Sequence, residues 1–250
     1  MYSFVTSRWV GMDLMSIENI KGIRQAIALA LEYEAESGDF NRGVLEHIAQ
    51  LPNAIDLGSA GDTKAAKKAL EQLVVRYVEN VPAFLEAIYQ ITGQACIDRD
   101  IEPFLKIAEE FFLKPPDIVD HHRGLAALME AAYLAHRLME ELNDRFIQHC
   151  GIPLVPLDMT RANVIVHHLI GERFANDLDN IVHYAADSLV KSEQIFKTSG
   201  FQKFARDHSN RGWSEELKRW PCLTQDLEVE LNIGGNCIAP PPKEEDFTVY

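Results

Sequence analysis

The chain of 250 residues carries 38 acidic and 24 basic side chains, which gives a formal net charge of −14. This excess of negative charge argues against a nucleic-acid partner, because a surface that binds nucleic acid must neutralise phosphates. Hydrophobic residues make up 47% of the chain and charged residues 25%, a composition typical of a globular protein, and a chain of this length can bury one sizeable core or two small ones. No stretch approaches the roughly 20 apolar residues that span a bilayer, so we expect no membrane association.

The first half of the chain is predicted to consist of helices joined by loops, one of them at residues 57–62, because apolar residues recur there at helical spacing between turn signals. Gly38 supplies a stop for the first helix, and Pro82 stands in the first turn of a separate helix, where its missing N–H is harmless. The break Lys114-Pro-Pro-Asp117 ends the last of these helices. The helices are expected at residues 16–37, 43–50, 63–80, 82–93 and 100–113.

Residues from about 120 to 190 form the centre of the predicted fold. They are read as two long helices joined by the loop Cys150-Gly-Ile-Pro-Leu-Val-Pro-Leu-Asp158, each with a broad apolar face and a polar border. We expect an antiparallel hairpin, in which residue 136 lies level with about 173 and residue 140 level with about 169. The sequence therefore predicts an all-α, single-domain bundle of about seven or eight helices around this hairpin.

The C-terminal part loses helical periodicity after two further short helices, expected at 201–208 and 215–220. We predict one helical domain over residues 1–221 and an irregular tail over 222–250, which is rich in proline and acidic residues. The start of the chain lacks the pattern of a signal peptide, and the four cysteines share no disulfide or metal spacing. A cytoplasmic location is therefore expected.

The two central helices carry the same pair of residues, His136 with Glu140 and His168 with Glu172. A His and a Glu four residues apart on a helix point the same way, about 6 Å apart along the axis. Neutral imidazole and carboxylate suit iron, manganese or zinc, and bundles hold such ions between facing helices. The doubled pair therefore predicts a mononuclear site for one of these metals.

Two acid or hydroxyl side chains near these pairs, Tyr133 and Asp179, are candidate catalytic residues that would shape a pocket for a small organic substrate. His167 is about 100° from His168 around the helix, so we do not expect it at the same site. The simpler interpretation treats the paired residues as ordinary boundary residues that make hydrogen bonds or salt bridges.

A second hypothesis is a cytoplasmic adaptor or regulator. Its acidic surface and polyproline tail would then bind a protein partner or a second copy of the chain. The sequence leaves open whether the protein is an enzyme, since it contains no nucleophile elbow, phosphate-binding loop or dinucleotide fingerprint.

One stretch suggests a third hypothesis. Tyr133-Leu-Ala-His-Arg-Leu-Met-Glu-Glu-Leu-Asn-Asp144 resembles the aromatic-x-x-x-Arg-x-x-acid-x-x-x-acid helix of squalene and phytoene synthases, and Asn176-Asp177-Leu-Asp179 resembles the second metal motif of isoprenoid synthases. The resemblance implies acidic side chains that bind magnesium, which in turn holds a diphosphate. The chain departs from the family by having Glu140 where the family has Asp, and by placing the second motif on the very next helix.

Overall fold

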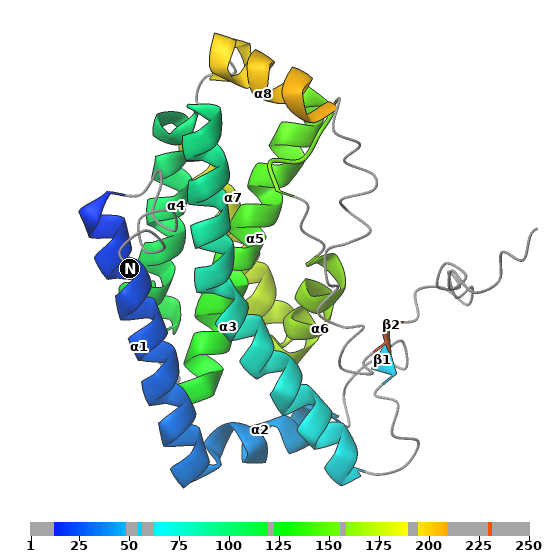
Figure 1. The fold of residues 1–250 in the computed structure, drawn as a ribbon. Helices are drawn as coiled ribbons and strands as arrows, with labels where there is room; N and C mark the ends of the chain where they lie inside the picture. Colours follow the sequence, from blue (N-terminus) through cyan, green and yellow to red (C-terminus); the bar gives the residue numbers. More distant parts are fainter. Residues whose placement is uncertain are drawn as a thin grey trace, which may run out of the picture.

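Helical periodicity in the sequence corresponds to eight α-helices in the described part of a computed structural model of the protein (Figure 1). The structure describes residues 13–48, 55–56, 63–119, 123–155, 159–189, 195–209 and 230–231. The helices are α1 (Leu14–Ser37), α2 (Asp39–Ile48), α3 (Thr63–Ala95), α4 (Asp98–Leu113), α5 (Gly124–Cys150), α6 (Thr160–Ile170), α7 (Glu172–Leu189) and α8 (Ser199–Ser209). Two 3-10 turns, η1 (Asp117–Val119) and η2 (Ile195–Lys197), and two short strands complete the described elements. The predicted all-α, single-domain bundle is confirmed.

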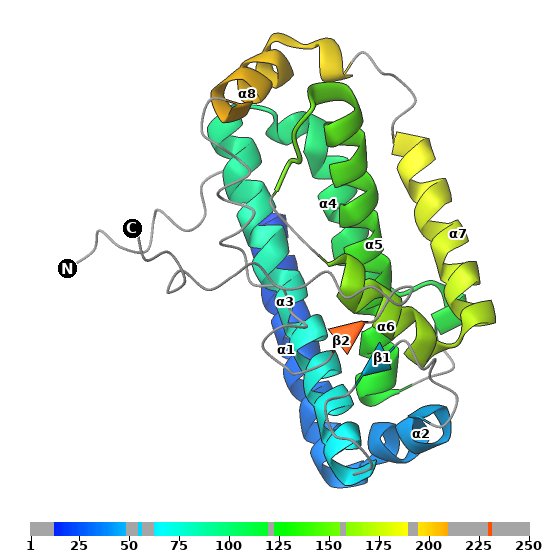
Figure 2. The same ribbon diagram turned by 90° about the vertical axis from the view of Figure 1, so that its right-hand side faces the viewer.

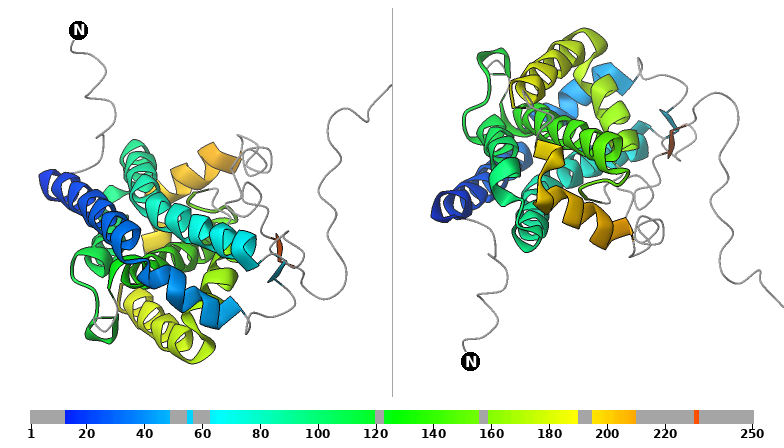
Figure 3. Two further views of the ribbon diagram at one scale, coloured as in Figure 1. Left: turned by 90° about the horizontal axis from the view of Figure 1, so that it is seen from below. Right: turned by 90° about the horizontal axis from the view of Figure 1, so that it is seen from above.

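Helix α5 is the central element of the bundle, because it contacts α1, α3, α4, α6 and α7. In the view from above in Figure 3, the green α5 lies between the yellow-green α7 on one side and the blue and cyan helices α1 and α3 on the other. Every residue from 129 to 136 is buried, so this stretch has no face toward solvent. The polar border predicted along α5 is therefore buried over these residues, because neighbouring helices cover the helix on all sides.

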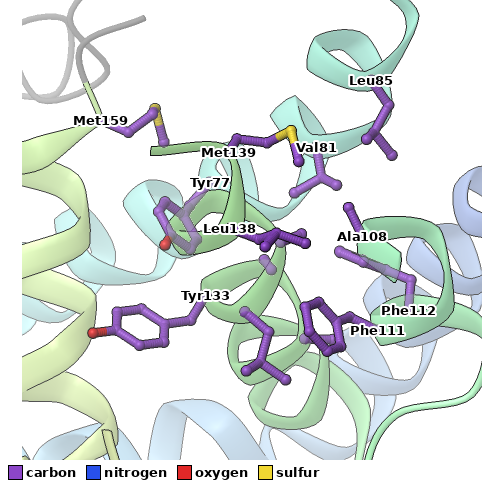
Figure 4. Close-up of a cluster of buried hydrophobic side chains, with 14 of the residues drawn as sticks. Tyr77, Val81, Leu85, Ala108, Phe111, Phe112, Tyr133, Leu138, Met139 and Met159 are labelled. Carbon is purple, nitrogen blue, oxygen red and sulfur yellow. The ribbon is translucent and has the colours of Figure 1, made fainter. Parts of the chain in front are cut away.

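The apolar core gathers around α5 (Figure 4). Leu138 is fully buried and lies in the cluster that contains Val81 and Leu85 of α3 and Phe111 of α4. Burial of each such side chain stabilises the fold by about 1.5–3 kcal/mol. The core therefore ties α3, α4 and α5 together and sets the positions from which polar side chains of α5 project.

The turn between α1 and α2 shows how local chemistry shifts a helix boundary. Gly38 adopts the left-handed conformation, with φ of 63°, and its N–H donates to the carbonyl of Glu34 at 2.8 Å. The buried carboxylate of Glu34 also accepts hydrogen bonds from the backbone N–H groups of Phe40 and Asn41, at 2.9 and 3.1 Å. These bonds satisfy the first amides of α2, which therefore starts at Asp39 and not near the predicted residue 43.

Helix α3 runs without a break from Thr63 to Ala95, with Pro82 inside it. The prediction of two helices separated at Pro82 is therefore wrong. Proline lacks an N–H and costs about 3 kcal/mol inside a helix. Buried side chains on both sides of it, including Tyr77 and Leu85, offset that cost by packing into one core. The helix changes direction along its length in Figure 1, as expected at an internal proline.

The predicted second helix of the central hairpin is two helices, because the chain turns at Gly171 between α6 and α7. Gly171 has φ of 95°, a value that favours glycine. Its N–H donates to the carbonyl of His167 at 3.0 Å and ends α6. Figure 2 shows α6 and α7 as separate elements that point in different directions.

The directions of the three central helices follow from their side-chain contacts. Tyr133 of α5 bonds to His167, and Glu140 bonds to Thr160, so α6 runs antiparallel to α5. Helix α7 runs parallel to α5, because the earlier of two arginines on α5 pairs with the earlier of two aspartates on α7, and the later arginine pairs with the later aspartate. These ion pairs are Arg137 with Asp179 and Arg145 with Asp187. The long antiparallel hairpin expected over 120–190 does not form in that shape.

The register between α5 and α6 also differs from the expected one. Residues 151–155, which follow α5, have no helical structure, and Asn143 fixes this segment by two hydrogen bonds to Val155. The Asn143 side chain donates to the Val155 carbonyl at 2.8 Å and accepts from its N–H at 3.0 Å. Thr160, at the start of α6, bonds to Glu140, whereas the predicted hairpin placed residue 140 level with about 169.

The remaining described elements are short. Strands β1 (Ile55–Asp56) and β2 (Glu230–Leu231) form one antiparallel pair. None of the described helices has both the length and the apolar character that crossing a membrane requires. The helix predicted at 215–220 and the boundary between domain and tail at 221–222 lie outside the described residues.

Candidate functional site

A pocket with a volume of about 340 Å³ lies where α5, α6 and α7 meet. It combines two carboxylates, one arginine, two histidines, a tyrosine and two neutral polar side chains with a single aliphatic one. The lining residues are Tyr133, Arg137, Glu140, Thr160, Asn163, Val164, His167, His168 and Asp179. We call this site the Tyr133 pocket.

Helix geometry explains why these residues gather. Tyr133, Arg137 and Glu140 are spaced by four and three residues and so lie along one side of α5. The lining residues of α6 recur at similar spacing, and the antiparallel course of α6 brings them against the same side of α5. Asp179 is supplied by α7, whose course beside α5 places it opposite Arg137.

The hydroxyl of Tyr133 is the centre of the polar contacts. Its ring is 1% exposed, and in Figure 4 its oxygen points away from the apolar cluster toward the yellow-green ribbon. The hydroxyl lies 3.0 and 3.2 Å from the two carboxylate oxygens of Asp179 and 2.9 Å from Nδ1 of His167. Burial and the negative charge of Asp179 raise the pKa of Tyr133 well above its ordinary value. Tyr133 therefore keeps its proton near neutral pH.

Arg137 joins the two carboxylates of the pocket. Its Nε donates to Asp179 at 2.9 Å, and its Nη1 donates to Glu140. Burial disfavours the charged guanidinium, but the hydrogen bonds and negative charges of Asp179 and Glu140 outweigh burial and raise the pKa of Arg137. The guanidinium stays charged and links α5 to α7.

Glu140 connects this cluster to α6 and α3. Its carboxylate accepts hydrogen bonds from Thr160 Oγ1 at 3.0 Å and from Asn163 Nδ2 at 2.8 Å. The other end of the Asn163 amide accepts a bond from the buried hydroxyl of Tyr77 at 2.6 Å. A continuous row of hydrogen bonds therefore runs from α3 through α6 and α5 to α7, and it holds the polar wall of the pocket in one arrangement.

The structure brings together four of the six residues singled out in the sequence. Tyr133, Glu140, His168 and Asp179 line the same pocket. The other two, His136 and Glu172, are not among the lining residues, and Glu172 is exposed at the start of α7.

His136 lies on the side of α5 that faces α3, where it is 1% exposed. Its Nε2 donates to the backbone carbonyl of Tyr77 at 2.8 Å. Its ring packs against Tyr77 and Phe84, with centroids 4.4 and 5.3 Å apart. Burial lowers the pKa of His136 to about 4, so this side chain is neutral at pH 7.

The predicted ligand set of His136, Glu140, His168 and Glu172 does not form one cluster in the described structure. Across the described ranges, no group of three or more His, Cys, Asp or Glu side chains is placed to hold a metal ion. The reason lies at Gly171, where α6 ends, so His168 and Glu172 no longer share one helical face. Binding of iron, manganese or zinc by this protein stays a prediction.

His167 and Arg137 are pocket residues that the sequence reasoning missed. His167 was set aside because of its angle to His168, yet the antiparallel register of α6 places it against Tyr133. Arg137 lies on the side of α5 that α7 covers, where it pairs with Asp179. An isolated glycine in a helical pattern suggests a break, so Gly171 was the available signal for this part of the fold.

No family model matches the chain, and neither a curated protein nor a solved structure matches it. Glu140 and Asp179 belong to the two stretches that resemble the metal motifs of isoprenoid synthases. In this structure Arg137 lies between their carboxylates and donates a hydrogen bond to each.

Proposed function

We propose that the protein binds a small organic cation in the Tyr133 pocket. The observation that carries this proposal is the row of hydrogen-bonded polar side chains that ends at an open pocket of about 340 Å³. Polar and charged groups in a bundle interior are costly, and apolar residues of similar volume often stabilise a protein as well or better. Such clusters are typical of functional sites, where they are held in place for a ligand.

The charge of the pocket favours a cation over an anion. Glu140 and Asp179 contribute two negative charges against the one positive charge of Arg137, which leaves one net negative charge among the lining residues. Burial lowers the pKa of His167, so its imidazole adds no positive charge near neutral pH. Carboxylate oxygens and a neutral imidazole nitrogen accept hydrogen bonds, which an ammonium or amidinium group donates.

The size of the pocket suits a small molecule. Its volume lies at the lower end of the roughly 300–1,000 Å³ that small-molecule sites occupy. Tyr133 and Asn163 are anchored by partners on other helices, so the pocket walls need little rearrangement on binding. Preorganised walls reduce the cost of ordering side chains around a ligand.

Calorimetric titration with butylammonium and benzamidinium chlorides, set against butyrate and benzoate, tests this proposal. We expect the cations to bind and the matched carboxylates not to bind. Asp179→Asn removes one negative charge from the pocket and should weaken cation binding about tenfold. Glu172→Gln makes the same change of charge on the exposed start of α7 and should leave binding unchanged. Equal binding of both classes of ion, or no binding of either cation, would contradict the proposal.

A transition metal ion is the second candidate ligand. Glu140 and His168, two of the four predicted ligands, line the Tyr133 pocket together with His167 and Asp179. Two imidazoles and two carboxylates are the donor types that suit iron, manganese or zinc. Some of them would have to move on binding, since no three of the described His, Cys, Asp or Glu side chains are placed around one ion. A metal-dependent enzyme that acts on a small organic substrate, with Tyr133 and Asp179 as catalytic residues, would use the same pocket.

A further inference from the structure

The Tyr133 hydroxyl can donate only one hydrogen, and three polar atoms lie beside it: the two carboxylate oxygens of Asp179 and Nδ1 of His167. Asp179 is ion-paired with Arg137, and its carboxylate can only accept. The contacts of 3.0 and 3.2 Å from the hydroxyl to Asp179 therefore use the tyrosine proton. Nδ1 of His167, at 2.9 Å from the same hydroxyl, has to supply the hydrogen for its own contact.

This count of protons fixes the tautomer of His167. A neutral imidazole carries one proton, and which nitrogen holds it is set by the partner of that nitrogen. Burial keeps the pKa of His167 below its ordinary value, and the adjacent His168 and Arg137 oppose further positive charge. Asp179 and Glu172 act in the opposite direction. With the proton on Nδ1, the Nε2 atom keeps a lone pair.

We propose that Nε2 of His167 is the hydrogen-bond acceptor that the Tyr133 pocket offers to its ligand, with Tyr133 and Asp179 as the positioning residues that hold the imidazole proton on Nδ1. This inference rests on the proposed binding of an organic cation and names the atom that receives the ligand's N–H group. In the bound state, Nε2 of His167 accepts a hydrogen bond from the ammonium or amidinium donor.

Long-range ¹H–¹⁵N correlation spectra of the histidine side chains test the inference in the full-length protein. We expect His167 to carry its proton on Nδ1. His136 serves as an internal reference with the opposite tautomer, because the carbonyl of Tyr77 can only accept and so requires hydrogen on Nε2. A wild-type protein in which His167 is protonated on Nε2 and bare on Nδ1 would overturn the inference.

Tyr133→Phe removes the acceptor for the Nδ1 hydrogen and should let the Nε2–H tautomer appear at His167. Butylammonium should then bind about tenfold more weakly, the effect of losing one hydrogen bond to a charged ligand. Tyr33→Phe is the matched control, since Tyr33 lies on α1 and bonds to Asp39 at 2.6 Å, outside the pocket. If Tyr133→Phe does not fold, the wild-type spectra alone decide the tautomer.

Addition of butylammonium to the wild-type protein separates the two proposals. We expect the Nε2 resonance of His167 to shift as the cation binds. If calorimetry detects binding while that resonance stays in place, the role of His167 is refuted and the cation site stands. If no cation binds while His167 shows its proton on Nδ1, the proposed ligand class is refuted and the tautomer assignment stands.

Discussion

The buried imidazole of His136 makes the stability of this protein sensitive to acid. Burial lowers its pKa from 6.5 to about 4 in the folded protein, whereas the unfolded chain keeps the ordinary value. The unfolded state therefore binds a proton more readily between these two values, and protonation favours unfolding there. The contribution of His136 to stability is fully present above pH 6.5 and is lost as the pH falls toward 4.

The magnitude of this effect follows from the difference between the two pKa values. Each unit of difference corresponds to about 1.4 kcal/mol, so the complete loss amounts to about 3 kcal/mol. About 2 kcal/mol of it should be lost by pH 5. That amount is a substantial share of the roughly 5–15 kcal/mol that stabilises a typical domain.

The test is urea denaturation followed by circular dichroism at pH values from 7 to 4.5, with His136→Gln beside the wild type. Glutamine does not titrate, and its amide can still donate to the Tyr77 carbonyl. We expect the variant to be less stable at pH 7, because the ring contacts with Tyr77 and Phe84 are lost. The difference between the two proteins should shrink by about 2 kcal/mol at pH 5.

A control separates this effect from acid denaturation in general. His183 lies on α7 with a side chain that is 66% exposed, and His183→Gln should follow the wild-type curve. If the free energy of unfolding of His136→Gln runs parallel to that of the wild type at all pH values, the buried neutral histidine does not cause the acid sensitivity and the reasoning is refuted.

Two further predictions concern a close backbone contact and the metal site. Gly124 has φ of +63°, and a Cβ atom there would lie 2.6 Å from Tyr33, so Gly124→Ala should lower stability by about 1–3 kcal/mol in urea denaturation. Gly43→Ala, with open space around its Cβ position in α2, should raise stability by about 0.5–1 kcal/mol, and a similar loss at both glycines would contradict this account. The metal prediction is tested by elemental analysis of protein purified without chelator. If a metal ion occupies the Tyr133 pocket, the His168→Ala variant should contain less metal than the wild type, and His136→Gln should contain the same amount. An equal loss of metal in both variants would argue against this placement.

The helices and the core of this protein were largely predictable from the sequence. The apolar stripe of α1 and the stop at Gly38 depend on local spacing and backbone conformation, which the sequence expresses directly. The apolar face predicted for α5, which includes Leu138, Leu142 and Phe146, is buried. The reason is that hydrophobic periodicity reports which residues avoid water, whatever partner eventually covers them.

The arrangement of the pocket depended on tertiary contacts that local patterns do not express. Pro82 stays inside α3 because core packing on both sides outweighs its local cost, and Gly171 turns the chain where a continuous helix was expected. The pairing of Asn143 with Val155 sets the register of α6, which places His167 against Tyr133. His136 contacts α3 instead, through the carbonyl of Tyr77. The spacing of residues in the sequence gives their angles around the axis of one helix. Which side chains of two helices face each other also depends on where the neighbouring helix begins and in which direction it runs.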